Sequence, residues 1–194
     1  MAKRIVIIDG HPDQDPGHLV PALCQAYRDG AVGGGHTVDL LRIADMEFPL
    51  LRTSKEFLSG TPPAAIAAAQ SAIRQADHLL IAYPLWLGSM PALLKGFMEQ
   101  TFRPGFAFSY ESKGWPKKGL KGRSARVVVT MGMPALAYRL FFRAHSLKSL
   151  ERNILKFCGI GPVRETLIGM VEGASSGKRD AWFKTMRRLG GTAR

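Results

Sequence analysis

Residues 3–19, KRIVIIDGHPDQDPGHL, contain the strand-to-helix junction that decides between two related folds. Residues 4–9 are almost entirely apolar, as expected for a strand of a parallel sheet that helices cover on both faces. A helix is expected over residues 19–30, so a dinucleotide-binding fold would carry a Gly-x-Gly-x-x-Gly fingerprint in the loop between them. That loop has only Gly10 and Gly17, and the fingerprint is absent.

Strand-like and helix-like segments alternate along the rest of the chain. Further strands are expected at 36–41, 77–83, 125–131 and 163–171, and helices at 62–76, 91–102, 143–157 and 178–189. Five strands alternating with helices predict an α/β fold built on a parallel sheet with helices on both faces. Since the glycine fingerprint is missing, the flavodoxin-like strand order 2-1-3-4-5 is favoured. Segment 44–61 is expected to be a loop, and segment 103–123 is long, polar and basic.

Length and composition are those of an ordinary globular protein. The 194 residues are 46% hydrophobic and 22% charged, which predicts one domain over residues 1–194. No apolar run is long enough to span a bilayer, so we expect no membrane insertion and a cytoplasmic location. Cys24 and Cys158 are expected to be buried small apolar residues, because their spacing supports neither a disulfide nor a metal site.

The formal net charge of +12 allows three interpretations. A basic surface can attract an anionic dinucleotide, bind nucleic acid or anionic lipid, or only keep the protein soluble. Basic residues concentrate at 113–126 and 178–194, and the sequence contains no known nucleic-acid-binding motif. Nucleic acid is therefore not an expected partner.

Ligands of such folds bind beyond the carboxyl ends of the strands, which directs attention to loops 10–18, 84–90 and 131–138. The first loop leads into a helix N-terminus, where free N–H groups favour an anion such as a phosphate, and His11 and His18 flank it. In the second loop, Gly88 allows close backbone approach, and Trp86 and Leu87 are expected to lie against a planar ring.

The stretch PLWLGSMPALLKG at 84–96 resembles the NAD(P)H quinone reductases of the flavodoxin-like superfamily, the DT-diaphorase type and its bacterial relatives. Three shorter segments are similar to the same family: Gly-Phe-Ala-Phe at 105–108, Gly-His-Pro at 10–12 and Thr-Met-Gly at 130–132. The resemblance runs from residue 4 to about residue 171. It implies a bound flavin (FAD, with FMN as the alternative), NAD(P)H as co-substrate, a quinone or similar planar acceptor, ping-pong hydride transfer and a homodimer.

The resemblance also implies roles for particular residues. Those expected to hold the flavin are His11, His18, Pro84, Leu85, Trp86, Leu87, Gly88, Thr130 and Gly132. Tyr138 and His145 correspond to a tyrosine–histidine pair that hydrogen-bonds the pyrimidine edge of the flavin and stabilises the charge formed there on reduction. Phe108 and Tyr110 are expected to cross the dimer interface and line the substrate pocket of the partner subunit.

The sequence departs from the family pattern at four places. Pro16 and His18 stand where the family has Ser or Thr and then Asn in the phosphate loop. Met133 and Pro134 replace a second glycine after the fourth strand, Phe108 replaces a tyrosine, and the spacing from Tyr138 to His145 is one residue longer than expected.

Two other functions are consistent with the pattern. The chain is also similar to ancillary subunits of bacterial potassium-efflux systems, in which the basic segment 111–126 would dock on a transporter. The third hypothesis is an electron-carrier flavodoxin. Such carriers are usually acidic and lack a segment like 105–110, so the charge of +12 argues against it.

Overall fold

The central strand β3 (His78–Pro84) is hydrogen-bonded to parallel strands on both sides and is buried along nearly its whole length. The computed structural model, which describes residues 1–111, 114 and 116–194, places it in a five-stranded sheet of order β2-β1-β3-β6-β7. Its partners are β1 (Arg4–Asp9), β2 (Thr37–Arg42), β6 (Ser124–Thr130) and β7 (Val163–Ile168). Counted within this sheet the order is 2-1-3-4-5, which confirms the predicted flavodoxin-like topology.

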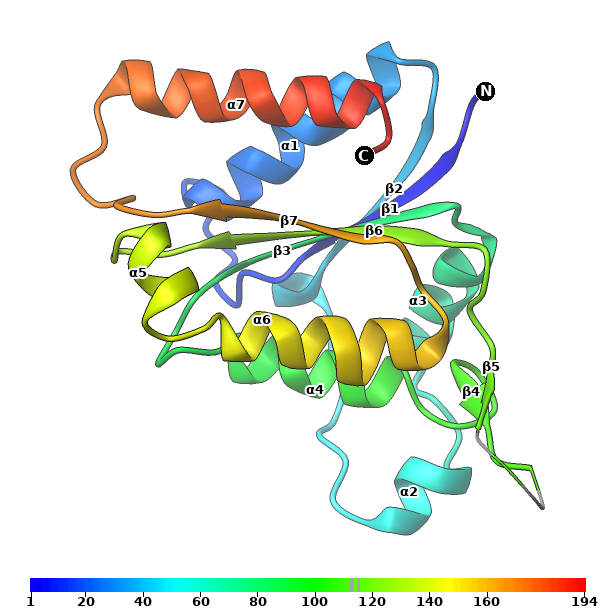
Figure 1. Ribbon diagram of the computed structural model, residues 1–194. Coiled ribbons are helices and arrows are strands. Elements are labelled where there is room, and N and C mark those ends of the chain that lie inside the picture. The colour runs from blue at the N-terminus through cyan, green and yellow to red at the C-terminus, as the bar shows by residue number, and fades with distance from the viewer. Residues whose placement is uncertain (112–113, 115) are drawn as a thin grey trace.

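Helices cover the sheet on both faces (Figure 1). One face carries α1 (Leu19–Gly33) and α7 (Ser176–Gly191), and the other carries α3 (Ala64–Gln75), α4 (Ala92–Thr101) and α6 (His145–Ser149), which continues into the π-helical turns η2 (Leu150–Lys156). Successive side chains of β1 belong to different cores: Ile5 and Ile7 pack under α1 and α7, and Val6 and Ile8 pack on the opposite side. Burial on both faces explains why β1 is a continuous apolar run.

Two glycines allow α1 and α7 to approach closely. A Cβ atom at Gly30 would lie 1.9 Å from the carbonyl oxygen of Arg187, and one at Gly190 would lie 2.0 Å from the carbonyl oxygen of Tyr27. No side chain larger than hydrogen fits at either position unless the helices move apart. The contact fixes α1, and with it the helix N-terminus that follows the first loop.

Three segments contain helices or strands that were not expected from the sequence. Segment 44–61 contains the short helix α2 (Ser54–Ser59), preceded by the 3₁₀ turn η1 (Ile43–Asp45). Segment 103–123 contains the hairpin strands β4 (Phe108–Ser109) and β5 (Lys117–Lys118), and α5 (Ala135–Leu140) replaces much of the expected loop 131–138. The proposed docking segment 111–126 includes residues 112, 113 and 115, which lie outside the described residues.

The helix expected at 143–157 begins later, at His145. Arg143 and Ala144 have φ angles of 51° and 48°, a left-handed conformation that interrupts the helical path between α5 and α6. The last strand is also shorter than expected, because β7 ends at Ile168 rather than at residue 171.

Both cysteines are free and buried, as predicted. Burial raises the pKa of the Cys158 thiol to about 12, so this side chain behaves as a small apolar residue. Within the part of the chain that the structure describes, no helix combines the length and apolar character needed to cross a membrane.

His78, the first residue of β3, is a fully buried histidine in basic surroundings. Its Nδ1 lies 2.8 Å from Ser124 Oγ, whereas its Nε2 has no hydrogen-bond partner. Burial, reinforced by the positive charges of Lys3, Arg126 and Arg164, lowers the pKa of His78 to about 4. The side chain is therefore neutral at physiological pH.

This pKa predicts a loss of stability in mild acid. Between about pH 6.5 and pH 4 the unfolded chain binds a proton at His78 and the folded chain does not, so the free energy of unfolding falls as the pH drops through this window. The full effect is about 3 kcal/mol. His78→Asn keeps a polar atom near Ser124 and should flatten the slope in urea titrations at stepwise pH. An unchanged slope would contradict the assignment.

The close contact between α1 and α7 predicts that the same substitution has different effects on stability at two glycines of α1. Gly30→Ala should lower the free energy of unfolding by about 1–3 kcal/mol, because its Cβ meets the α7 backbone. Gly33→Ala is the matched control: it faces open space and should be neutral or gain up to about 1 kcal/mol. Urea denaturation measures both, and equal effects would argue against close packing at Gly30.

Candidate functional site

Loops that follow β1, β3 and β6 meet at the carboxyl edge of the sheet. The N–H of Leu85 donates to the carbonyl oxygen of Thr130 at 2.8 Å, which ties the start of the second loop to the end of β6. The ring of His11, in the first loop, lies edge-on to the ring of Trp86 with centroids 6.2 Å apart. The structure thus brings the first two predicted loops together and ties the second to the end of β6.

Residues 86–89 form a tight turn that holds two large apolar side chains in solvent. Trp86 N donates to Ser89 O, and Ser89 N donates to Trp86 O, both at 2.9 Å. Leu87 and Gly88, between them, have φ angles of 46° and 76°, as in the two-residue turns of hairpins. The Trp86 side chain is half exposed and Leu87 is fully exposed. The turn therefore presents an apolar surface suited to a planar ring.

The first loop uses most of its backbone N–H groups internally. His11 N donates to Asp9 Oδ1 at 3.1 Å, Asp15 N donates to Asp13 Oδ1 at 2.9 Å, and Gly17 N donates to Asp15 Oδ1 at 2.8 Å. An anion at this loop must therefore find its donors elsewhere. The first turn of α1 offers them, because the leading N–H groups of a helix have no partner within it.

The two histidines of this loop differ in what they offer a ligand. Their rings stack with centroids 4.1 Å apart. His11 Nδ1 accepts from Asp13 N, and burial, followed by the neighbouring charge of His18, lowers the pKa of His11. His11 is thus neutral with its proton on Nε2, which makes it a single donor. His18 Nε2 lies 3.0 Å from Asp13 Oδ2 and is already engaged.

Thr130 and Gly132, the predicted flavin-binding residues at the end of β6, lie at the carboxyl edge of the sheet but differ in exposure. Thr130 is buried at the end of β6, in register with Pro84 of β3. Gly132 is exposed, and Glu172 Oε1 lies 3.4 Å from the position that a Cβ atom would take there.

A cavity of about 400 Å³ lies beside the first loop. It joins the N-terminus of α1 to the first turns of α7, and its lining residues are Gly17, His18, Leu19, Ala22, Val171, Glu172, Arg179 and Phe183. Glu172 and Arg179 are not among the residues predicted from the sequence. The position of Glu172 just beyond the last strand, on the edge where ligands of this fold bind, is the signal that identifies it.

Tyr138 and His145, the predicted tyrosine–histidine pair, differ in their surroundings. Tyr138 is buried, and its hydroxyl lies 2.7 Å from Ser146 Oγ and accepts a hydrogen bond from Leu147 N at 3.2 Å. These two contacts anchor the start of α6. His145 is exposed at the first position of the same helix.

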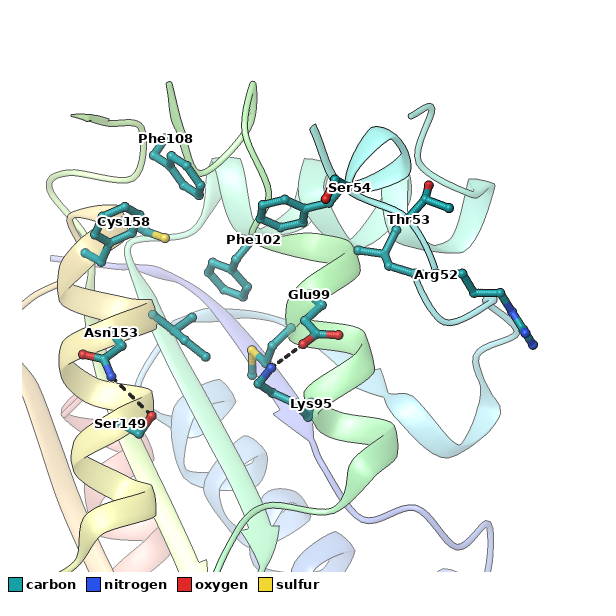
Figure 2. A pocket seen from close by; sticks show the side chains of 15 residues that line it. Arg52, Thr53, Ser54, Lys95, Glu99, Phe102, Phe108, Ser149, Asn153 and Cys158 are labelled. Carbon is teal, nitrogen blue, oxygen red and sulfur yellow. Dashed lines mark hydrogen bonds and ion pairs between the residues drawn. The ribbon is translucent and has the colours of Figure 1, made fainter. Parts of the chain in front are cut away.

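The two residues predicted to cross the dimer interface, Phe108 and Tyr110, also differ in exposure. Phe108 is buried, with its ring centroid 4.9 Å from that of Phe157, whereas Tyr110 is exposed. Phe108 lines a cavity of about 630 Å³ between α2, α4 and η2 (Figure 2). No residue of the three carboxyl-edge loops lines this cavity, and the Lys95–Glu99 ion pair lies along its α4 wall.

Comparison with known proteins gives the family. A family model, Flavodoxin_2, described as a flavodoxin-like fold, matches residues 3–188, and the chain belongs to this family. The chain is 32% identical over 112 residues to an uncharacterized NAD(P)H oxidoreductase of Haemophilus influenzae, with 57% of this chain and 55% of that protein covered.

An FMN-dependent NADH:quinone oxidoreductase of Nitratidesulfovibrio vulgaris is 31% identical over 127 residues, which cover 57% of this chain and 60% of that protein. The chain thus spans a little more than half the length of these curated relatives. Among solved structures, NAD(P)H:quinone oxidoreductase from Methanothermobacter marburgensis superposes with a TM-score of 0.84 at 23% identity, with both chains covered completely. This likeness supports the fold.

The arrangement around Tyr138 predicts that its hydroxyl stabilises the fold. Tyr138→Phe should lower the free energy of unfolding by about 1 kcal/mol or more, because the Leu147 N–H loses its acceptor. Tyr83→Phe is the matched control, because the Tyr83 hydroxyl is buried without a partner and its removal should be neutral or stabilising. Urea denaturation of both variants tests this, and a neutral Tyr138→Phe would show that the hydroxyl has no structural role.

Proposed function

We propose that this protein is a flavin-dependent NAD(P)H:quinone oxidoreductase. The observation that carries the proposal is the turn at 86–89, which presents Trp86 and Leu87 at the carboxyl end of β3 beside His11. Relatives named as NAD(P)H and NADH:quinone oxidoreductases support the same assignment.

The residues present fit a flavin. A planar ring has an apolar surface at Trp86 and Leu87, and an approach to the backbone at Gly88, where no atom lies within 4 Å of a would-be Cβ. An anionic phosphate has donors in the neutral His11 and in the first turn of α1. The carboxylates of Asp13 and Asp15 already accept hydrogen bonds from backbone N–H groups of the first loop. We therefore propose that the phosphate binds at the N-terminus of α1 rather than in the loop.

The chain's own residues bind and orient the reactants. The bound flavin would supply the hydride chemistry, and the protein supplies position and electrostatics. The 86–89 turn would set the plane against which NAD(P)H and then the quinone stack in turn, a ping-pong order that needs only one exposed ring face. His11, held neutral by burial, donates without adding a positive charge to the site.

The cofactor in this proposal is FAD, with FMN as the alternative. The 400 Å³ cavity continues from the N-terminus of α1, where the phosphate is placed. It offers Arg179 to a second phosphate, and Leu19 and Phe183 to an adenine ring. The FMN-dependent relative supports the alternative, in which this cavity stays outside the cofactor site.

We also propose a homodimer in which Tyr110, rather than the buried Phe108, reaches the partner subunit. The large cavity between α2, α4 and η2 is lined by apolar side chains such as Met98 and Phe102, which a second copy would cover. A cytoplasmic location remains a prediction. The transporter-subunit alternative gains no support from the described residues.

The turn provides the direct test of the proposal. A Trp86→Ala, Gly88→Val double variant should bind flavin at least about tenfold more weakly and lose NAD(P)H oxidation in proportion, because it removes the ring contact and strains a residue at positive φ. Leu58→Ala, an equally exposed apolar side chain on α2, is the control and should leave both unchanged. Wild-type turnover in a folded double variant would refute the assignment.

Arg179 distinguishes the two cofactors. Arg179→Glu should weaken FAD binding by about tenfold or more, since a favourable charge contact becomes repulsive, and leave FMN binding within about twofold. Isothermal titration of the apoprotein with each flavin measures this. Equal losses for FAD and FMN, or none for FAD, would show that the cavity does not hold an adenylate half.

A further inference from the structure

Helix α5 and the residues that follow it carry an exposed apolar surface that the proposed flavin site does not use. Four large side chains, Leu136, Leu140, Phe141 and Phe142, are between 48% and 81% exposed. The rings of Phe141 and Phe142 contact each other edge to face, with centroids 5.0 Å apart. Single exposed apolar residues are common on soluble proteins, but a group within seven residues marks an interaction surface. We call residues 136–143 the α5 surface.

The fold itself holds this surface outward. Tyr138 is the buried residue of α5, and its hydroxyl is fixed by Ser146 and Leu147. Ala144 N donates to the Tyr138 carbonyl oxygen at 3.0 Å, which closes the left-handed junction after the helix. Because the inward face of α5 is anchored in this way, its apolar outer face cannot turn into the protein's own core.

Positive charge surrounds the α5 surface. Arg139 and Arg143 lie within it, Lys148 follows on α6, and residues 133–150 contain no acidic side chain. Arg139 forms an ion pair with Glu165 of β7, while the exposed Arg143 has no ion-pair partner among the described residues. The partner of this surface should therefore combine an apolar layer with negative charge.

We propose that the α5 surface docks the protein on an anionic lipid bilayer. Leucine and phenylalanine side chains enter the boundary between headgroups and acyl chains, and Arg143 and Lys148 meet the lipid phosphates. A second copy of this chain fits less well, because a two-fold interface would gather Arg143 and Lys148 of both copies into one contact area. Glu165, the carboxylate that contacts this surface through Arg139, is already paired.

Docking also defines a substrate class, and this step rests on the proposed function. Helix α5 begins five residues after Thr130, at the edge of the sheet where Trp86 and Leu87 are presented. A protein held to the bilayer by α5 has this edge close to the lipid. The quinones it reduces would then be those dissolved in the membrane, with apolar tails.

Vesicle sedimentation of the flavin-loaded protein tests the proposal. Wild type should bind vesicles that contain phosphatidylglycerol and bind pure phosphatidylcholine vesicles much more weakly, and binding should fall as salt rises. Leu140→Ser with Phe141→Ser should reduce the vesicle partition coefficient by at least about tenfold. The matched control, Val32→Ser with Leu58→Ser, removes two similarly exposed apolar side chains elsewhere and should bind as wild type does.

A second pair of variants tests whether positive charge at the α5 surface itself contributes to vesicle binding. Arg143→Glu should weaken binding to the anionic vesicles by roughly tenfold. Lys184→Glu, at an exposed position on α7, makes the same change in net charge and should have little effect. Equal losses from both would mean that only the total charge of the protein attracts it to lipid, and would overturn a docking site at α5.

The remaining outcomes separate this proposal from the proposed function. If the wild-type protein does not bind vesicles, membrane docking is overturned. It is also overturned if the Leu140→Ser, Phe141→Ser substitutions convert a dimer to a monomer, because α5 would then contact a second copy of the chain. Turnover of a short-chain, water-soluble quinone should be unchanged in this variant, while turnover of a long-chain quinone in vesicles falls. Vesicle binding without any flavin-dependent turnover would support docking and refute the proposed enzyme.

Discussion

The burial of β3 between β1 and β6 is the constraint on which the rest of the structure depends. Its side chains pack into both cores, and its hydrogen bonds fix the register of both neighbours, so the ends of three strands lie at one edge. The Leu85–Thr130 hydrogen bond extends that register by one residue beyond the sheet. The turn at 86–89 therefore projects from a rigid base, which positions two apolar side chains in solvent without support from a larger loop.

A second constraint acts from the opposite core. The glycine contacts between α1 and α7 set how closely the two helices approach each other. They also bring Arg179, in the first turn of α7, to the side of the first loop where His18 and Leu19 lie. Helix packing thus determines the distance between the N-terminus of α1 and the cavity that we propose for the adenylate half of FAD.

Much of this architecture could be predicted from local sequence. The apolar run at residues 5–8 indicated a strand buried on both faces, and the absence of a glycine fingerprint after it favoured the correct strand order. The loops that meet at the carboxyl edge followed from that order. Helix α2 could also have been predicted, because Thr53 and Glu56 have the spacing of a capping box and form one in the structure.

Other features depend on contacts distant in sequence and escaped prediction. Nothing local to Tyr138 shows that its hydroxyl hydrogen-bonds Ser146 and Leu147 at the start of α6. The cavity that Glu172 and Arg179 line depends on where α7 lies beside α1. Likewise, the spacing of histidine and aspartate residues did not reveal that carboxylates occupy the amides of the first loop, because that pattern depends on the backbone path from Asp9 to Gly17.

The most direct test of the central claim is to measure the two half-reactions separately without oxygen. The protein is loaded with FAD or FMN, mixed with NADPH or NADH, and followed by the loss of the flavin absorbance band; a quinone is then added. The account predicts rapid, stoichiometric bleaching by the nicotinamide and full recovery of the band on addition of quinone, both slowed in the Trp86→Ala, Gly88→Val variant. A protein that binds neither flavin, or whose bound flavin is not bleached, would contradict it.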